Sequence, residues 1–314
     1  MICFYHKSDL DGLCSAAIVH RAHPDCELYP IDFGDRFPWD KATGEVIMVD
    51  FSLPIDDMIK LSKLCKFTWI DHHKAIISQY LALDDSNKGP WHAYVSVEKA
   101  ACELAWEYFN KDIPPPINVT LLGRYDSWRK DEGDWEGETL PHQYGMKAVK
   151  PEPKDQYWEA LFSNAMGASA KNILVSNGKV ILSYLNRENE VMMRDQAFNA
   201  NIYICPTCQL NTKTFNDFGV RKCKCGGKVD SAPILVLNRQ PASSQMFESR
   251  WNPKFHRMML AFSVGDRGVC RVSIYTTHKD LDCSAIAKKL GGGGHVGAAG
   301  FMASTEQLLH LLGD

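Results

Sequence analysis

The residue types that bind divalent metal ions recur at the ends of strand-length apolar runs in the N-terminal half of the chain. Three such runs, at residues 2–5, 46–49 and 67–70, are each followed closely by aspartate or histidine. Because functional groups gather at the carboxyl ends of parallel strands, we expect these side chains to meet in one crevice. Asp126, after a helix-like stretch, could reach the same place. The candidates after the three runs are His6, Asp9 and Asp11, then Asp50, and then Asp71, His72 and His73.

A cluster of carboxylates without a compensating charge is costly, because like charges raise one another's pKa. A divalent cation removes that cost. Aspartate oxygens combined with imidazole nitrogens favour Mn²⁺, with Mg²⁺, Fe²⁺, Co²⁺ or Zn²⁺ as alternative occupants. Any one of these residues could be a loop residue or a helix cap. Three separate runs that end in compatible ligands favour a metal site.

A second set of ligands lies in the C-terminal half, where four cysteines are spaced as C-x2-C and C-x-C. The first pair is Cys205 and Cys208, and the second is Cys223 and Cys225. Four thiolates on two short knuckles are typical of a closed, structural zinc site. The alternatives are four unrelated buried cysteines or a redox pair. Neighbouring lysines and arginines could contact a nucleic acid, but a solvated charged face is the simpler interpretation.

Glycine is concentrated in a third segment, residues 291–300, in which six of the residues are glycine. The tract contains Gly292, Gly293, Gly294 and His295, followed by an apolar block that a flexible linker would not contain. Small residues let backbone N–H groups approach a phosphate closely, and a following helix would add a favourable dipole. His295 could donate to the same anion. The segment is therefore a candidate phosphate-binding element.

The alternation of apolar runs with helical spacing predicts the scaffold of the first half. Strand, helix, strand order is typical of a parallel α/β sheet covered on both faces. A polar segment rich in Gly and Pro, residues 127–155, is expected to be a loop or an interdomain segment. The strands are expected at residues 2–5, 28–31, 46–49 and 67–70, and the helices at 15–22, 55–65, 97–109 and 117–122.

The second half shows helical patterning first and strand-like runs later. Residues 157–200 are expected to be helical and to connect the two halves. The glycine tract falls between two expected helices. The strands are expected at residues 234–237, 258–264 and 269–276, and the helices at 285–290 and 306–312.

The composition of the chain excludes several classes of protein. The 314 residues suffice for two domains, and 45% apolar with 23% charged residues is ordinary for a globular protein. With 35 basic and 38 acidic residues, the net charge of -3 excludes a nonspecific DNA-coating protein. No run approaches the roughly 18 apolar residues of a membrane span. Without a recognisable secretory signal, we expect reduced cysteines and a cytoplasmic location.

The acidic and histidine motifs resemble the four ordered motifs of the DHH phosphoesterases. The matching residues are His6-Lys7-Ser8-Asp9-Leu10-Asp11-Gly12, Asp50, Asp71-His72-His73 and Asp126. The resemblance implies one metal held by His6, Asp9 and Asp50. It implies a second metal held by Asp11, Asp50, His72 and Asp126, with Asp50 bridging. Asp71 would orient its neighbours, and His73 would face the phosphate.

The glycine tract resembles the glycine-histidine motif of the DHH-associated C-terminal domain, which binds the phosphate and sugar of the substrate. This resemblance excludes the pyrophosphatases of the family, which carry a different C-terminal domain. Exonuclease-like members commonly have an arginine in the strand before the preceding helix, where this chain has Tyr275. Tyr275 could stack on a base but supplies no charge. Arg271 or Arg267 could take the place of that arginine.

These observations together predict a two-domain α/β phosphoesterase. The expected divisions are a catalytic domain at 1–130, a loop and linker helices at 131–200, a zinc ribbon at 201–229 and a substrate-binding domain at 230–314. Two Mn²⁺ ions about 3.5–4 Å apart would activate water for in-line attack on phosphorus, and one structural Zn²⁺ would hold the ribbon.

Short RNA or DNA oligonucleotides are the expected substrates, as in the oligoribonucleases of the NrnA and NrnB kind. The alternatives are a pAp-type phosphatase (pAp is adenosine 3′,5′-bisphosphate), a cyclic or linear dinucleotide phosphodiesterase, and a non-enzymatic nucleic-acid-binding or sensing protein. A processive exonuclease of the RecJ type is disfavoured, because those enzymes are larger. We expect no membrane partner, and a homodimer is one option for the assembly.

Overall fold

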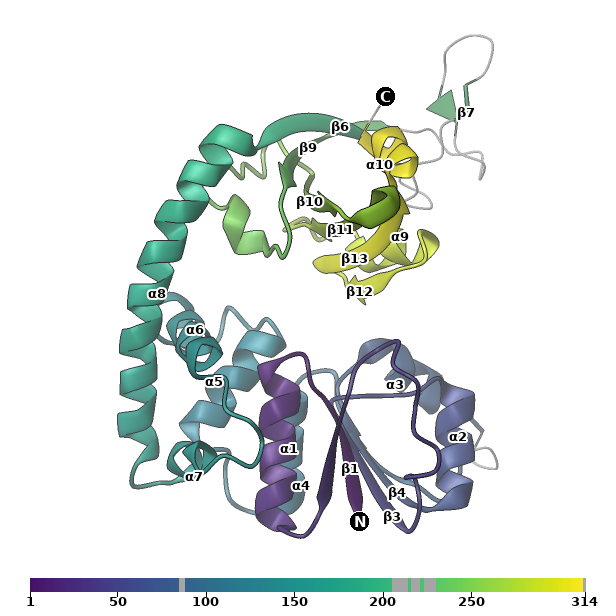
Figure 1. Ribbon diagram of the computed structural model, residues 1–314, viewed down its shortest axis with the longest axis vertical. Coiled ribbons are helices and arrows are strands. Elements are labelled where there is room, and N and C mark those ends of the chain that lie inside the picture. Colours follow the sequence, from purple (N-terminus) through teal and green to yellow (C-terminus); the bar gives the residue numbers. More distant parts are fainter. Residues whose placement is uncertain (85–87, 205–213, 216–220, 223–229, 313–314) are drawn as a thin grey trace. The chain divides into compact units, whose positions relative to one another are not determined.

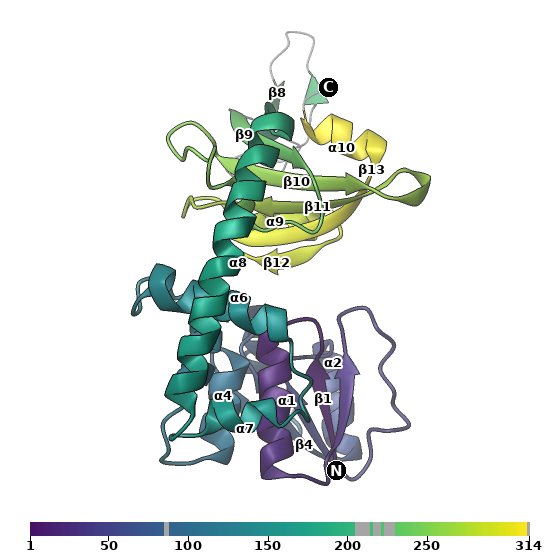
Figure 2. The ribbon, with the colours of Figure 1, turned by 60° about the vertical axis from the view of Figure 1, so that its left-hand side comes forward.

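The computed structural model describes residues 1–84, 88–204, 214–215, 221–222 and 230–312. Contacts divide the chain into two compact units, Met1–Ser183 and Tyr184–Asp314. The boundary falls inside the long helix α8 (Gly167–Gln196) (Figure 2). None of the described helices combines the length and the apolar character needed to cross a membrane.

A five-stranded parallel sheet in the order β2-β1-β3-β4-β5 forms the centre of the first unit (Figure 1). Its strands are almost continuously apolar because both faces of the sheet are covered. In β1, Cys3 and Tyr5 face one core, whereas Ile2 and Phe4 face the other. The strands are β1 (Ile2–His6), β2 (Glu27–Ile31), β3 (Glu45–Val49), β4 (Lys66–Asp71) and β5 (His92–Val95).

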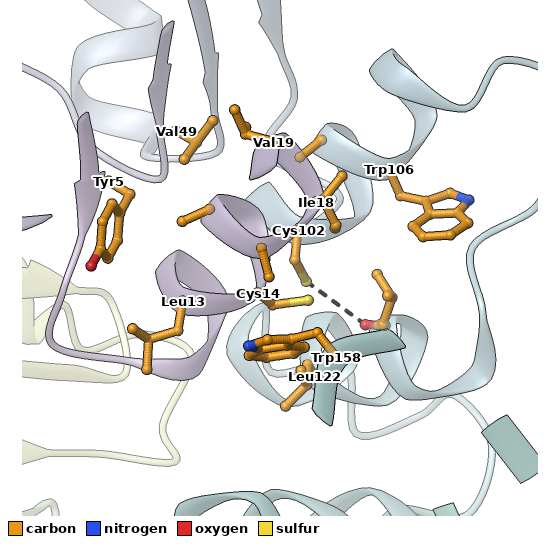
Figure 3. Packing of buried hydrophobic residues seen from close by; sticks show 14 of the residues in the cluster. Tyr5, Leu13, Cys14, Ile18, Val19, Val49, Cys102, Trp106, Leu122 and Trp158 are labelled. Carbon is orange, nitrogen blue, oxygen red and sulfur yellow. Dashed lines mark hydrogen bonds between the residues drawn. The ribbon is translucent and has the colours of Figure 1, made fainter. Parts of the chain in front are cut away.

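Helices cover both faces of this sheet. One face packs against α1 (Leu10–Ala22), α4 (Ala101–Phe109) and α5 (Ile117–Asp126), and the other against α2 (Ile55–Leu64) and α3 (Lys74–Leu81). Figure 3 shows the contact between α1 and α4, where Cys14 and Cys102 are fully buried. Small side chains at this contact let the two helices approach closely. The N-terminus of α4 consequently lies beside the start of α1.

The prediction of a loop over residues 127–155 is wrong in its second half. A π-helical turn, η1 (Trp135–Thr139), leads into α6 (Leu140–Val149), and α7 (Tyr157–Phe162) follows. The glycine and proline that suggested a loop have packing roles here. Pro141 occupies the first turn of α6, where no backbone N–H is needed. A Cβ on Gly145 would lie 2.2 Å from the carbonyl oxygen of Leu174 in α8.

The second unit is built on a six-stranded mixed sheet in the order β12-β13-β11-β10-β9-β6. Only β9 and β10 pair in parallel. Besides the C-terminal part of α8, its described helices are α9 (Cys283–Lys289), α10 (Thr305–Leu312) and the short turns η2 (Ser244–Phe247) and η3 (Asp266–Gly268). The strands are β6 (Phe198–Ile204), β9 (Asp230–Asn238), β10 (Met258–Val264), β11 (Val269–Tyr275), β12 (Gly293–His295) and β13 (Ala298–Ser304).

The predicted fold class, a mixed α/β protein with a parallel first sheet, is confirmed. One local expectation is wrong, because residues 198–200 begin strand β6 instead of ending a helix. The apolar block after the glycines forms strand β13, in which Ala299, Phe301 and Ala303 alternate into the core with a period of two.

The proposed zinc ligands lie outside the described residues, so the zinc site stays a prediction. Between them the structure describes two short strands, β7 (Thr214–Phe215) and β8 (Arg221–Lys222), which pair in an antiparallel manner. The four cysteines concerned are Cys205, Cys208, Cys223 and Cys225.

Candidate metal centre

Three overlapping groups of potential metal ligands lie at the carboxyl edge of the first sheet, and two of them make up the predicted metal sites. His6, Asp9 and Asp50 form one group, and within it a ligand atom of each residue lies within 4.8 Å of the others. The second group meets the same criterion and consists of Asp11, His72 and Asp126. The third group consists of Asp50, Asp71, His72 and His73, so all eight candidates predicted from the sequence lie close together.

Asp50 presents one oxygen to each group. Its Oδ2 lies 3.5 Å from Nδ1 of His6, and its Oδ1 lies 3.3 Å from Nε2 of His72. Directly after β3, the backbone of Asp50 has a φ of 51°, in the left-handed region that non-glycine residues seldom adopt. This conformation ends the strand and leaves the carboxylate between the two groups. The two oxygens of Asp50 therefore face different groups, and its bridging role stays a prediction.

The tight turn from β1 into α1 positions the first three ligands. Asp9 caps α1 by accepting a hydrogen bond of 2.9 Å from the backbone N–H of Gly12. A Cβ on Gly12 would lie 2.0 Å from the carbonyl oxygen of His6, so the helix can begin this close to the strand only with glycine there. Asp9 Oδ2 thereby lies 2.8 Å from Nδ1 of His6.

The N-terminus of α4 holds the buried carboxylate of Asp11. Its two oxygens accept hydrogen bonds of 2.9 and 2.7 Å from the backbone N–H groups of Ala101 and Cys102. Unpaired N–H groups and the helix dipole stabilise an anion at this end of a helix. Within the second group, Asp11 Oδ2 lies 3.6 Å from Nε2 of His72.

Asp126 ends helix α5, and a glycine one turn earlier brings this end close to the site. A Cβ on Gly123 would lie 2.4 Å from Oε2 of Glu103, a buried residue in α4 that pairs with Arg129. Asp126 Oδ2 lies 3.3 Å from Nε2 of His72. A carboxylate at the C-terminal end of a helix is disfavoured by the dipole, so a nearby cation would stabilise it.

Burial and neighbouring charges shift the pKa values of residues in both groups. Burial, together with repulsion from Asp11 and Asp9, raises the pKa of Asp50 well above its usual range. Burial and Asp11 likewise raise the pKa of Asp126. Burial would lower the pKa of His6, but the adjacent carboxylates of Asp50 and Asp9 raise it to about 11. Bound cations would offset the repulsion between these carboxylates.

The donor set fits divalent metal ions. His6 Nδ1 and Asp50 Oδ2 are buried, and neither makes a well-aligned hydrogen bond within the described parts of the chain. Buried polar atoms are almost always satisfied, so such a pair calls for an explanation. Oxygens mixed with imidazole nitrogens suit Mn²⁺ or a similar first-row ion.

Asp71 has protein partners for both oxygens and serves His73. Its Oδ2 accepts a hydrogen bond of 3.1 Å from the Trp69 indole, and its Oδ1 accepts one of 2.7 Å from the backbone N–H of His72. Oδ1 also lies 2.7 Å from Nδ1 of His73. Although burial opposes it, the charge of Asp71 raises the pKa of His73. Asp71 therefore holds the ring of His73 through Nδ1 and holds His72 through its backbone N–H.

Two residues of the loop after β2 were missed by the sequence argument. Asp32 Oδ1 lies 3.2 Å from Nε2 of His6, on the side of the ring away from Asp9, and Ser8 donates a short hydrogen bond to Asp32. A carboxylate on the second nitrogen fixes a metal-binding histidine. Asp32 follows a predicted strand, so the rule that found Asp50 could have found it.

The second missed residue is Phe33, whose side chain is 53% exposed. Its ring centre lies 5.4 Å from that of His6 and 5.5 Å from that of His73. An exposed aromatic ring at this distance from both histidines forms an apolar border of the metal centre. No spacing rule marks it, because the loop that carries it has no periodic pattern.

In the second unit, the structure brings several predicted substrate-binding residues onto one face of the sheet. Tyr275 lies opposite Ala298, which lies opposite His295, and opposed residues of antiparallel strands project to the same side. Gly293 and Arg271 belong to the same face by alternation. Arg267 lies in the η3 turn, apart from this register.

The glycines differ in what surrounds them. A Cβ on Gly292 would lie 2.1 Å from the carbonyl oxygen of Gly300, and Gly294 has a φ of 143°. Nothing lies within 4 Å of a Cβ on Gly293 among the described residues. Tyr275 donates a hydrogen bond of 2.6 Å to the carbonyl of Ala242, so its hydroxyl is held by the protein. Base stacking by Tyr275 stays a prediction.

Comparison with known proteins gives matches at the level of structure alone. No protein-family profile and no curated protein sequence matches the chain. A solved DHH domain, from a member of a family of ribosomal proteins, matches with a TM-score of 0.53 and 15% identity, over 98% of this chain and 83% of that one. The chain has a DHH-type fold.

Two further solved structures are similar over most of their length. A pGpG-specific phosphodiesterase, PggH, from Vibrio cholerae has a TM-score of 0.44 and 13% identity, over 98% of this chain and 95% of that one. An exopolyphosphatase-related protein from Bacteroides fragilis has a TM-score of 0.46 and 12% identity, with coverages of 99% and 89%.

Proposed function

We propose that the protein is a metal-dependent phosphoesterase that hydrolyses phosphodiester bonds of short oligonucleotides. The observation that carries this proposal is the position of Asp50, which directs one carboxylate oxygen to each of two histidine–aspartate groups. A DHH-type fold alone would not suffice, because one fold can host unrelated functions.

The six ligands divide between two cations. His6, Asp9 and Asp50 would hold one ion, and Asp11, Asp50, His72 and Asp126 the other. Two divalent cations bound in this way neutralise charge on a phosphoryl group and activate water for in-line attack. Asp32 keeps the ring of His6 in place through Nε2, which leaves Nδ1 directed toward Asp9 and Asp50.

His73 is the proposed proton carrier. Its Nδ1 is engaged by Asp71, so Nε2 would donate to a phosphoryl oxygen or to the leaving oxygen. Although burial lowers it, the charge of Asp71 raises the pKa of His73, which favours the protonated ring that such donation needs. The carboxylate of Asp71 stabilises the positive charge and fixes the ring, in the manner of an orienting aspartate in a catalytic triad.

In the second unit, the exposed backbone of the glycine tract and the side chain of His295 are the proposed contacts for the sugar and phosphate of the substrate. Gly293 has open space where a side chain would stand, which suits a close approach of a phosphate to the backbone. Arg271 lies on the same face of the sheet and supplies a positive charge.

The deciding experiment is incubation with Mn²⁺ and a panel of substrates, read by mass spectrometry. The panel contains 5-mer RNA and DNA, linear and cyclic dinucleotides, and pAp. Release of mononucleotides from RNA and linear dinucleotides supports the proposal. Exclusive action on pAp or on cyclic dinucleotides would replace it with one of those activities. If purified protein with full metal content turns over none of them, the protein is a binding or sensing protein instead.

A further inference from the structure

A pocket of about 260 Å³ opens beside the metal centre within the first unit. It lies where the start of α1 and the ends of α5 and α6 meet. Its volume is smaller than the roughly 300–1,000 Å³ of pockets that hold a whole small molecule. It suits one part of a substrate whose remainder lies elsewhere. The lining residues used below are Asp9, Asp11, Asp126, Gln143, Lys147 and Lys150.

The pocket has an acidic side and a basic side. Asp9, Asp11 and Asp126 belong to the metal centre, whereas Lys147 and Lys150 come from the C-terminal end of α6. Within the described residues neither lysine forms an ion pair. The ammonium of Lys147 lies over the ring of Tyr125, 5.3 Å from its centre. The aromatic ring holds the cation without neutralising it.

Lys150 also has a role at the end of α6. Lys150 ends α6 with a φ of 44°, in the left-handed region where glycine is the usual residue. A lysine near the end of a helix also interacts favourably with the dipole. A stability measurement therefore has to separate that role from ligand binding.

Gln143 adds a buried polar group to the same pocket. The residue is 5% exposed, and no described residue hydrogen-bonds to its side-chain Oε1. Buried amides almost always have partners, so this group is consistent with a polar ligand or an ordered water in the pocket.

We propose that Lys147 and Lys150 bind a second phosphate of the substrate, one that is not cleaved. This inference rests on the proposed function, because it assumes that the reacting phosphate lies at the metal centre. Lysine binds phosphate as a point charge. In a linear dinucleotide, the phosphate that is not cleaved is a terminal 5′-phosphate next to the cleaved linkage. The chain would then prefer 5′-phosphorylated dinucleotides over unphosphorylated ones.

The test compares two substrates that differ only in this phosphate, pApA and ApA, with Mn²⁺. Lys147→Gln and Lys150→Gln are each expected to lower kcat/KM for pApA by roughly 10- to 100-fold, the effect of losing a charged hydrogen bond. The loss on ApA is expected to be several-fold smaller, so the preference for pApA shrinks. Lys111→Gln, an exposed lysine outside the pocket, is the matched control.

Melting temperature and bound Mn²⁺ are measured for each variant, so that misfolding or metal loss is recognised. Equal losses on pApA and ApA, or a wild-type enzyme without preference between them, would overturn the inference while leaving the phosphoesterase proposal intact. If the wild type cleaves neither dinucleotide, the proposed function fails. Calorimetry of pAp binding then tests whether the pocket binds phosphate. Weaker binding by the variant that combines Lys147→Gln and Lys150→Gln supports phosphate binding there, and unchanged binding rejects it.

Discussion

The metal centre of the first unit and the glycine tract of the second would bind phosphate by opposite means. In the metal centre, charged side chains are buried or half-buried and converge from β1, β3, β4, α1 and α5 or the residues next to them. In the tract, contiguous residues expose their backbone along one strand pair, and His295 is exposed. Buried charge gives strong electrostatic interactions but must be compensated, whereas an exposed backbone costs little and contributes less.

The sharpest test of this contrast is Asp50→Asn. Asparagine tolerates the left-handed backbone better than alanine does, so this change removes the charge with little strain. We expect loss of activity and of metal uptake, because the shared carboxylate would be gone. The metal-free variant should melt at a higher temperature than the metal-free wild type, since one repelling charge has been removed. Asp40→Asn, at an exposed site, is the control.

Elemental analysis and thermal melting with and without EDTA provide the readouts for Asp50→Asn. Near-normal turnover at saturating Mn²⁺ would show that Asp50 does not bridge two ions.

His73→Ala should have the next largest effect. We expect kcat to fall by roughly 10²–10⁴-fold, the usual range for acid–base assistance. Metal content should stay at the wild-type level, because His73 Nδ1 is engaged by Asp71. Single-turnover kinetics with metal analysis on the same sample separate the two effects. A fall in bound metal would make His73 a ligand.

Metal binding should release protons. The carboxylates of Asp50 and Asp9 outweigh burial and raise the pKa of His6 to about 11, against about 6.5 in the unfolded chain. The protonated His6 therefore stabilises the metal-free fold fully below about pH 6.5, and this contribution is lost as the pH rises through about 11. A cation at Nδ1 displaces that proton, so affinity should rise about tenfold per pH unit for each proton released.

Calorimetry of Mn²⁺ binding at pH 7 to 9, in buffers of different ionisation enthalpy, measures the protons released. His6→Gln is the comparison variant, because it has no proton to lose at this position. Affinity that does not change with pH would contradict the assignment of His6 as a ligand.

In the glycine tract, Gly292→Ala and Gly293→Ala form a matched pair with smaller expected effects. The Cβ at position 292 meets the carbonyl of Gly300, so this variant should lose about 1–3 kcal/mol of unfolding free energy. The Cβ at position 293 meets no described atom, so stability should hold while KM for an oligonucleotide rises. Denaturant unfolding and steady-state kinetics test the pair. If Gly293→Ala leaves KM unchanged, the backbone there does not contact substrate.

The smallest effect on turnover is expected for Cys208→Ser. The four cysteines should hold one zinc that survives brief EDTA treatment, while that treatment removes activity and Mn²⁺ restores it. The variant should lose the zinc and some stability but keep its rate per folded molecule. Protein purified under reducing conditions without zinc would disprove the ribbon.

Local sequence was sufficient for the elements that are periodic and for the ligands that follow them. The apolar runs before His6, Asp50 and Asp71 are strands because a parallel strand covered on both faces must be apolar throughout. Helix α6 was missed because Pro141 and Gly145 suggest a loop, although one begins the helix and the other lets α8 approach.

What the sequence by itself determined was the α/β class and the eight acidic and histidine candidates, since both follow from residue type and local period. The choice of six metal ligands among those eight is what the resemblance to the DHH phosphoesterases implies. Tertiary structure decided which oxygen of Asp50 faces which group, that Asp32 and Phe33 border His6, and that Lys147 and Lys150 share a pocket with Asp126. These pairs are far apart in sequence, and only the packing of helices against the sheet brings their side chains together.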